Sequence, residues 1–128
     1  MMTCGIGCRR GTPPEDIWAA IRLARSTFPY AKDITVIATE TSKGNEPGVR
    51  ETAHRLSVAL ITFTTDELES VASRLLTVSP ATLKHKNVPS IAEAAALLAG
   101  GANARLLGPR VATATTTCAL AVVDGDRP

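Results

Sequence analysis

Aromatic residues are scarce in this chain of 128 residues, which has one Trp, one Tyr and two Phe. Proteins that bind single-stranded nucleic acid stack the bases on aromatic side chains, so this class of function is disfavoured. A strong charge of one sign is also lacking, because 14 basic and 12 acidic residues leave a net charge of +2. That balance gives no electrostatic argument for a nucleic-acid partner, and any basic site has to be local.

Long apolar runs are missing as well. No stretch approaches the ~20 apolar residues that a membrane-spanning helix needs, and Arg9 and Arg10 interrupt the short apolar start, so no secretory signal peptide is predicted. We therefore expect no membrane association and a cytoplasmic location. The three cysteines, Cys4, Cys8 and Cys118, have no spacing typical of a disulfide framework. They are expected to be reduced thiols.

Aliphatic residues have to supply the core instead. The hydrophobic fraction is 45%, and a chain of this length buries roughly two thirds of its unfolded surface. The length predicts one domain over residues 1–128. Short β-branched runs alternate with stretches of helical periodicity, which is typical of an α/β fold. We expect a single three-layer α/β/α domain with a mixed sheet, whose ligand crevice is lined by loops at the carboxyl ends of strands.

Periodicity and capping signals predict the individual elements. Helices are expected at 13–27, from 47 to about 56, from 64 to about 75 and at 90–100, buried strands at 34–38 and 58–63, and one long strand or a hairpin over 110–123. The Ser/Thr-x-x-Glu pattern of a capping box begins at Thr12, Thr64 and Ser90. Residues 77–89 contain two prolines and are expected to form an irregular connection.

The sequence Cys-Gly-Ile-Gly-Cys-Arg-Arg-Gly at residues 4–11 is the most distinctive motif. Its glycines allow positive φ angles and a close approach of ligand to backbone, and its arginines carry fork-shaped donors suited to carboxylate or phosphate. The helix predicted directly after it would add free N–H groups. We expect an anion-binding turn formed by Gly5, Gly7, Cys8, Arg9, Arg10 and Gly11. A tight connection whose arginines face solvent is the alternative.

Two other kinds of site are disfavoured by spacing. The glycines of the motif are one residue further apart than in a dinucleotide fingerprint, and no Gly-Lys-Ser/Thr phosphate loop occurs, which leaves nucleotide binding as a weak alternative. Cys4 and Cys8 form a single C-x3-C pair without a matching second pair, and His54 and His85 are isolated, so no structural metal is predicted. No cofactor is expected either.

Several polar residues have competing explanations. A depressed pKa would make Cys8 reactive beside Arg9, although the need for a small residue in a crowded turn is as good an explanation. Lys43 and Glu46 are candidate ligand contacts, and a surface ion pair or a carboxylate at a helix start explains them equally well. Glu93 is a capping-box residue first and a site candidate second. No compact nucleophile, base and acid set is visible, so catalytic residues are not assigned.

The motifs also carry a resemblance to a known family. In chain order they are residues 5–11, Lys43-x-x-Glu46-x-Gly48, Ser79-Pro80, residues 90–98 and residues 117–121. Over nearly the whole chain they resemble the cobalamin-biosynthesis family that comprises CobE and the C-terminal domain of CbiG. Little sequence stands ahead of Cys4, where the family usually has a fuller apolar strand, so we expect the first strand to be short.

The resemblance implies an α/β domain acting at the corrin-ring stage of vitamin B12 synthesis. Longer CbiG-type proteins open the δ-lactone of cobalt-precorrin-5A, whereas a stand-alone chain of this size is more similar to CobE. The expected function is to bind a precorrin or hydrogenobyrinic acid as a carrier or as a partner of other cobalamin-pathway enzymes. A small precorrin hydrolase that uses Glu46 or Glu93 as its base is the alternative.

The carboxylates of such a ligand call for several N–H donors and cations around a shallow apolar surface. We expect Arg9, Arg10 and Lys43 to bind the carboxylates. The full set of ligand contacts expected from the motifs is Gly5, Gly7, Cys8, Arg9, Arg10, Gly11, Lys43, Glu46, Ser79, Glu93 and Thr117.

Overall fold

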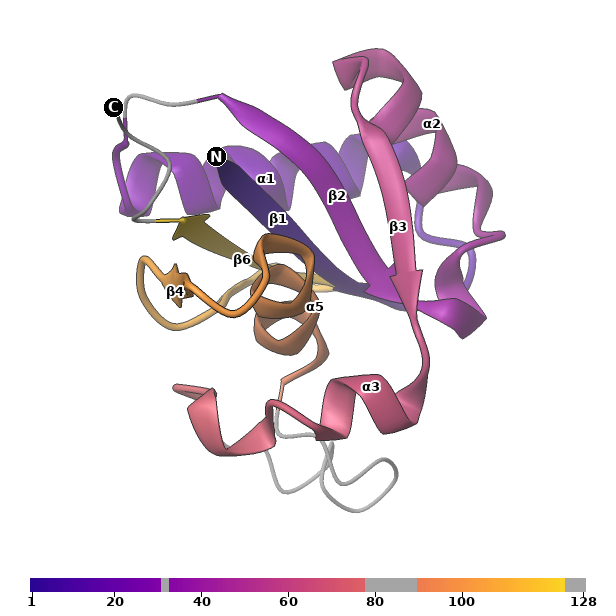
Figure 1. The fold of residues 1–128 in the computed structure, drawn as a ribbon. Coiled ribbons are helices and arrows are strands. Elements are labelled where there is room, and N and C mark those ends of the chain that lie inside the picture. The colour runs from indigo at the N-terminus through magenta and orange to yellow at the C-terminus, as the bar shows by residue number, and fades with distance from the viewer. Residues whose placement is uncertain (31–32, 78–89, 124–128) are drawn as a thin grey trace.

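The computed structural model describes residues 1–30, 33–77 and 90–123, which form a mixed sheet with helices on both faces (Figure 1). The strand order is β3-β2-β1-β6-β4, and β5 pairs with β6. The first three strands run parallel to one another, and β6 is antiparallel to β1, β4 and β5. The strands are β1 (Met2–Cys8), β2 (Ile34–Glu40), β3 (Ala59–Phe63), β4 (Ala104–Leu106), β5 (Val111–Ala112) and β6 (Thr116–Val123).

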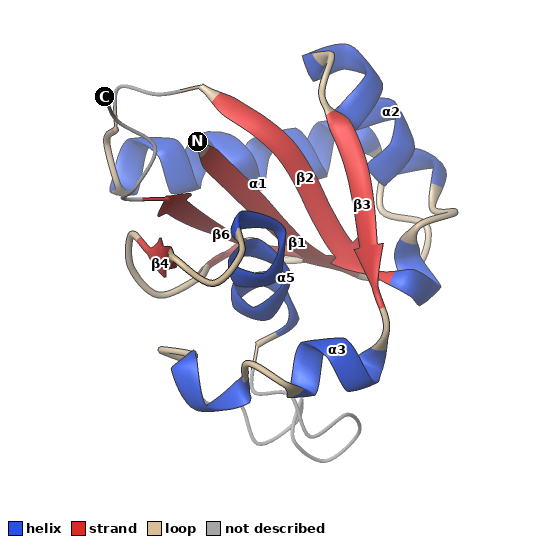
Figure 2. Cartoon of the chain, viewed as in Figure 1, coloured by secondary structure: helices blue, strands red, loops and turns tan. Residues whose placement is uncertain are grey.

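The helices form the outer layers of the fold. Helices α1 (Pro14–Thr27) and α2 (Pro47–Leu56) lie behind the sheet in Figure 2, and α5 (Ile91–Gly100) lies in front of it. Helix α3 (Thr65–Glu69), below the strands in this view, packs on the same side as α5, since its Leu68 clusters with Ala94 and Ala95. Short 3-10 turns, η1 (Thr41–Lys43) and η2 (Ala72–Arg74), follow β2 and α3. The α/β fold with a mixed sheet is therefore confirmed. Among the described residues, no helix has the length and apolarity to cross a bilayer.

The two faces of the sheet differ in side-chain size, because side chains alternate along a strand. The face toward α1 and α2 carries large residues from β1 and β6, namely Met2, Cys4, Ile6, Cys118, Leu120 and Val122. The face toward α5 carries Ala119 and Ala121, and α5 adds Ala92 and Ala96. Small residues on both sides of this contact let α5 lie close against the sheet.

Gly5 is the point of closest approach between α5 and β1. A Cβ added at Gly5 would lie 1.8 Å from the Ala92 carbonyl oxygen and 2.7 Å from the Ala96 nitrogen. Thr3 reinforces the contact, since its hydroxyl donates to the Ala96 carbonyl at 2.7 Å. The placement of Gly5 and Gly7 in a turn was therefore wrong: both belong to β1, which is seven residues long and not the short strand expected.

The second half of the structure departs from the prediction in two elements. β3 is not a buried strand, because it lies at one edge of the sheet described here and Ile61 is 39% exposed. α3 ends at Glu69 and does not continue to Leu75, but its capping box is confirmed: the Glu67 N–H donates to Thr64 Oγ1 at 3.2 Å, and the Thr64 N–H donates to Glu67 Oε1 at 2.8 Å.

The other two capping boxes do not form as expected. At α1 the N-cap is Pro13 without a side-chain hydrogen bond, and the Thr12 hydroxyl donates to the Arg9 carbonyl at 2.7 Å. At α5 the Glu93 N–H donates to Ser90 Oγ at 3.3 Å, but the Glu93 carboxylate accepts its hydrogen bonds from other segments. The hairpin alternative for residues 110–123 is confirmed by β5 and β6, and β4 was not predicted.

Candidate functional site

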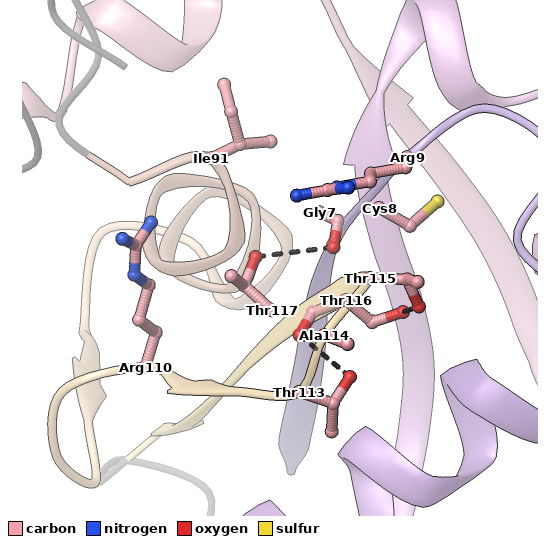
Figure 3. Close-up of a pocket in the computed structure, with 10 residues that line it drawn as sticks. All are labelled: Gly7, Cys8, Arg9, Ile91, Arg110, Thr113, Ala114, Thr115, Thr116 and Thr117. Atoms are coloured by element: carbon pink, nitrogen blue, oxygen red, sulfur yellow. Dashed lines mark hydrogen bonds between the residues drawn. The ribbon is translucent and has the colours of Figure 1, made fainter. Parts of the chain in front are cut away.

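A cavity of about 330 Å³ lies where β1 ends, beside the first residue of α5 and the β5–β6 hairpin (Figure 3). This position at the carboxyl end of a parallel strand is the usual place for a ligand crevice in α/β sheets. The residues that line the cavity are Gly7, Cys8, Arg9, Ile91, Arg110, Thr113, Ala114, Thr115, Thr116 and Thr117.

The turn after β1 is fixed from three directions. The Thr12 N–H donates to the Arg9 carbonyl at 3.2 Å, and Gly11 has φ of +78°, which favours glycine. The Gly11 N–H donates to Glu46 Oε1 at 2.7 Å, which links the turn to the start of α2. The Arg9 N–H donates to the Thr115 carbonyl at 3.0 Å. The backbone that carries the Arg9 side chain is thus held in place.

Threonines from the β5–β6 hairpin form the opposite wall. The Thr113 N–H donates to the Thr116 carbonyl at 2.8 Å and closes the hairpin. The Thr117 hydroxyl donates to the Gly7 carbonyl at 3.3 Å, across the β1–β6 pairing, as Figure 3 shows. The Thr115 and Thr116 hydroxyls lie 3.2 Å apart. This wall offers hydroxyl groups that both donate and accept hydrogen bonds.

Two arginines give the cavity its charge. Arg9 comes from the turn after β1 and Arg110 from the residue before β5, and both line the same cavity. Seen as in Figure 3, the start of α5 near Ile91 lies between the guanidinium groups of Arg9 and Arg110. In residues 1–30, 33–77 and 90–123 the salt bridges recorded join Arg55 to Glu15 and Glu51, and neither cavity arginine takes part. None of the described residues that line the cavity is acidic, so the site favours an anion.

Cys8 is half-buried at the edge of this cavity. Burial raises the pKa of the Cys8 thiol above its ordinary value; Lys43 opposes this, and the carboxylates of Glu46 and Glu40 add to it. The expectation of a depressed pKa was therefore wrong, because the loss of solvation and two nearby acidic residues outweigh the effect of the cation.

We expect Cys8 to be the cysteine that reacts with a thiol reagent in the native protein, and to need a higher pH than free cysteine does. Cys4 and Cys118 are fully buried, with their Sγ atoms 3.4 Å apart. Because the thiolate is the reactive form, a raised pKa moves the increase in rate above the ordinary value of about 8.5. The rate with a chromogenic disulfide, followed from about pH 7 to about pH 10, measures this.

Reagent added to unfolded protein provides the control, since all three thiols should then react at the ordinary rate. A native Cys8 that reacted at neutral pH as fast as free cysteine would contradict the proposed effect of burial.

The structure brings together some of the residues expected in the site and separates others. Gly7, Cys8, Arg9 and Thr117 line the cavity. Outside its lining lie Gly5, which is covered by α5, Glu93, which is fully buried, and Arg10, Gly11, Lys43 and Glu46, which lie in or after the turns that follow β1 and β2. Ser79 lies outside the described residues.

Sequence reasoning missed Arg110, Ile91 and residues 113–116. The only local signal was the run Thr-Ala-Thr-Thr-Thr at 113–117, of which Thr117 was assigned to the site and the rest only to a long strand or a hairpin. These residues join the site because β6 pairs with β1 in a register that sets Thr116 opposite Cys8 and Thr117 opposite Gly7. Within the described ranges, no group of three or more His, Cys, Asp or Glu side chains is placed to hold a metal ion.

Comparison with known proteins places the chain in a family. Residues 2–121 match the family described as the cobalamin synthesis G C-terminus. The chain belongs to this family. A relative from Sinorhizobium sp, Protein CobE, is 30% identical over 121 residues, which are 94% of this chain and 79% of that protein. The resemblance noted from the motifs is confirmed.

Solved structures from the same family share the fold. The crystal structure of CobE, a protein from the cobalamin (vitamin B12) biosynthetic pathway, has a TM-score of 0.86 and 31% identity and covers 94% of this chain and 89% of that one. Cobalamin biosynthesis protein ChiG from Agrobacterium tumefaciens has a TM-score of 0.73 and 39% identity, with 97% and 99% coverage. A putative cobalamin biosynthesis protein G homolog from Sulfolobus solfataricus, at 22% identity and a TM-score of 0.68, shares the fold over 96% of this chain and 37% of its own.

Proposed function

We propose that this protein acts in cobalamin biosynthesis by binding a carboxylate-rich corrin precursor, a precorrin or hydrogenobyrinic acid, at the cavity between β1, α5 and the β5–β6 hairpin. It acts there as a carrier or as a partner of other cobalamin-pathway enzymes in the cytoplasm. The observation that carries the proposal is that Arg9 and Arg110 line one cavity, and that none of its described lining residues is acidic. Its family relatives are cobalamin biosynthesis proteins, which supports the choice of ligand.

The chemistry of the cavity suits the rim of such a ligand. Corrin precursors carry acetate and propionate groups, and a guanidinium group binds a carboxylate through two parallel hydrogen bonds. The hydroxyl of Thr115 and the free N–H groups at the start of α5 add further donors, whereas the Thr113 hydroxyl already donates to the Thr116 carbonyl. A volume of about 330 Å³ is at the lower end for ligand pockets, about 300–1,000 Å³. We infer that the cavity binds carboxylate groups at one edge of the macrocycle.

A carrier fits the surroundings of the two carboxylates better than a hydrolase does. A general base has to reach the proton that it removes. Glu93 is 0% exposed and its carboxylate already accepts hydrogen bonds from Leu76, Thr77 and Arg110. Glu46 accepts the Gly11 N–H and is outside the cavity lining. Both acids therefore have structural partners in this fold.

An anaerobic titration of the protein with hydrogenobyrinic acid and with earlier precorrins tests the proposal. The expected result is a saturable shift of the visible spectrum near one equivalent, with the recovered pigment unchanged in mass. Conversion of many equivalents to a product of different mass would instead support the hydrolase. The absence of a shift with every pigment would overturn the ligand assignment.

A further inference from the structure

Glu93 is a fully buried carboxylate at the third position of α5, two residues after Ile91, which lines the cavity. From the described residues it accepts four hydrogen bonds, which come from two other segments. Oε1 accepts the N–H groups of Leu76 and Thr77 at 2.6 and 3.0 Å. Oε2 accepts the Arg110 N–H at 2.9 Å and the Thr77 hydroxyl.

This arrangement differs from that of an ordinary capping glutamate. In a capping box the glutamate returns to the N–H of its own N-cap residue, as Glu67 does at α3. Glu93 instead accepts hydrogen bonds from Leu76 and Thr77, which precede it by 17 and 16 positions, and from Arg110, which follows it by 17 positions. Burying a charge without compensation costs free energy. The four hydrogen-bond donors and the N-terminal end of α5 offset that cost for the Glu93 carboxylate.

One of the segments that donate to Glu93 carries Arg110, which lines the cavity. The Arg110 backbone is fixed at its N–H by Glu93, and the next two residues, Val111 and Ala112, pair with β6. The Arg110 side chain therefore leaves a backbone that is anchored on both sides of its Cα. Side chains of Arg110 and Ile91 line the cavity, whereas Glu93 does not.

We propose that Glu93 is a positioning residue for the anion site: its carboxylate fixes the Arg110 backbone so that the guanidinium group lies at the cavity next to the start of α5. The inference rests on the proposed function, because it assigns how that same site is built. The ligand recognised through this arrangement is a carboxylate group, and Glu93 acts on it through Arg110 alone.

A double-mutant cycle tests the inference, with hydrogenobyrinic acid as the titrant. Glu93→Gln keeps the shape of the side chain but replaces one acceptor by an NH2 group that faces an N–H donor. We expect Glu93→Gln and Arg110→Ala each to weaken binding about tenfold, as for one charge-assisted hydrogen bond. The double variant should then be weakened by about tenfold as well, because Glu93 has no further route to the ligand. Independent effects, which multiply to about 100-fold, would overturn the inference.

Thr77→Val is the matched control. It removes the hydroxyl hydrogen bond to Glu93 Oε2, the oxygen that also accepts the Arg110 N–H, but leaves the carboxylate itself unchanged. We expect lower stability and an affinity within about twofold of the wild type, since the Arg110 N–H keeps its acceptor. If Thr77→Val weakened binding as much as Glu93→Gln, loss of packing alone would explain both results and the positioning role would be rejected.

Hydrogen exchange separates this inference from the proposed function. At the Arg110 amide, Glu93→Gln should speed exchange at least about tenfold with no ligand present, because the N–H loses its buried acceptor. Unchanged exchange there would overturn the positioning role even if pigment binds. Faster exchange in a protein that binds no pigment would overturn the function and leave the role of Glu93 in the backbone established. If Glu93→Gln does not fold, Glu93→Asp, which keeps the charge on a shorter side chain, replaces it in both experiments.

Discussion

Replacing Gly5 by alanine is expected to destabilise the protein by about 3 kcal/mol or more, or to prevent folding. The added Cβ would lie 1.8 Å from the Ala92 carbonyl oxygen and 2.7 Å from the Ala96 nitrogen. Both are backbone atoms of α5, so no side-chain rotation relieves the clash and the helix has to move away from β1. That movement would also open the contacts that Ala92 and Ala96 make with β6.

Urea unfolding followed by far-UV circular dichroism measures the effect, and Gly11→Ala is the matched control. Gly11 has a positive φ but no atom within 4 Å of an added Cβ, so its replacement costs only backbone strain, about 1–2 kcal/mol. A Gly5→Ala protein with the unfolding midpoint of the wild type, or one more stable than Gly11→Ala, would contradict the account of the β1–α5 contact.

Simultaneous replacement of Arg9 and Arg110 by alanine is expected to weaken binding of hydrogenobyrinic acid about 100-fold or more. A hydrogen bond to a charged group contributes about 1.5–3 kcal/mol, and two such losses correspond to about two orders of magnitude in Kd. Both side chains line the cavity and neither supports the fold through a recorded salt bridge among the described residues. The thermal unfolding midpoint should therefore stay close to that of the wild type.

The control removes the same charge from another surface. Arg22 and Arg25 are exposed on α1, outside the cavity lining. Either pair of substitutions takes the net charge from +2 to 0, so both variants lose the same long-range attraction for an anion. Titrations at equal ionic strength should show little change for Arg22→Ala/Arg25→Ala. Equal losses in the two variants would mean that general charge, and not this cavity, attracts the pigment.

Elements that depend on local signals were predictable from the sequence. The Thr64–Glu67 capping box, the start of α2 at Pro47 and the end of α5 at Gly100 agree with the structure. So does the alternation of strands and helices that indicates an α/β fold. In each case the residues that determine the structure are within a few positions of one another.

The role of Gly5 and Gly7 was not predictable in the same way. Glycine serves both positive φ and close backbone approach, and the residues around it do not distinguish the two. The useful signal was the alternation of large Met2, Cys4 and Ile6 with small intervening residues, which indicates a strand with one crowded face. The prediction that β3 is buried was wrong because it relied on local sequence alone. Its apolar residues are typical of a buried strand, but its place at the edge of the sheet depends on the strand order.

The cavity itself depends on contacts between distant segments. Arg9 and Arg110 are about a hundred positions apart in the chain and line the same cavity because β6 returns beside β1. Glu93 had the spacing of a capping residue, yet its acceptor atoms are used by Leu76, Thr77 and Arg110. Patterns in the sequence indicate which residue types bind anions, whereas the strand register decides which of them share a site.

The pairing of β1 with β6 also determines how long β1 lacks one of its two partner strands while the protein is being synthesised. These two strands form the middle of the sheet, and Cys4 and Cys118, which touch across them, are 114 positions apart. A ribosome that adds about 5–20 residues per second needs roughly 6–23 s to pass from one to the other. During that interval β1 has been synthesised, whereas the strand that completes its second edge has not. Pairings of this kind slow folding, so chaperones that cover an exposed strand edge have longer to act on this topology than on one whose central strands are adjacent in sequence.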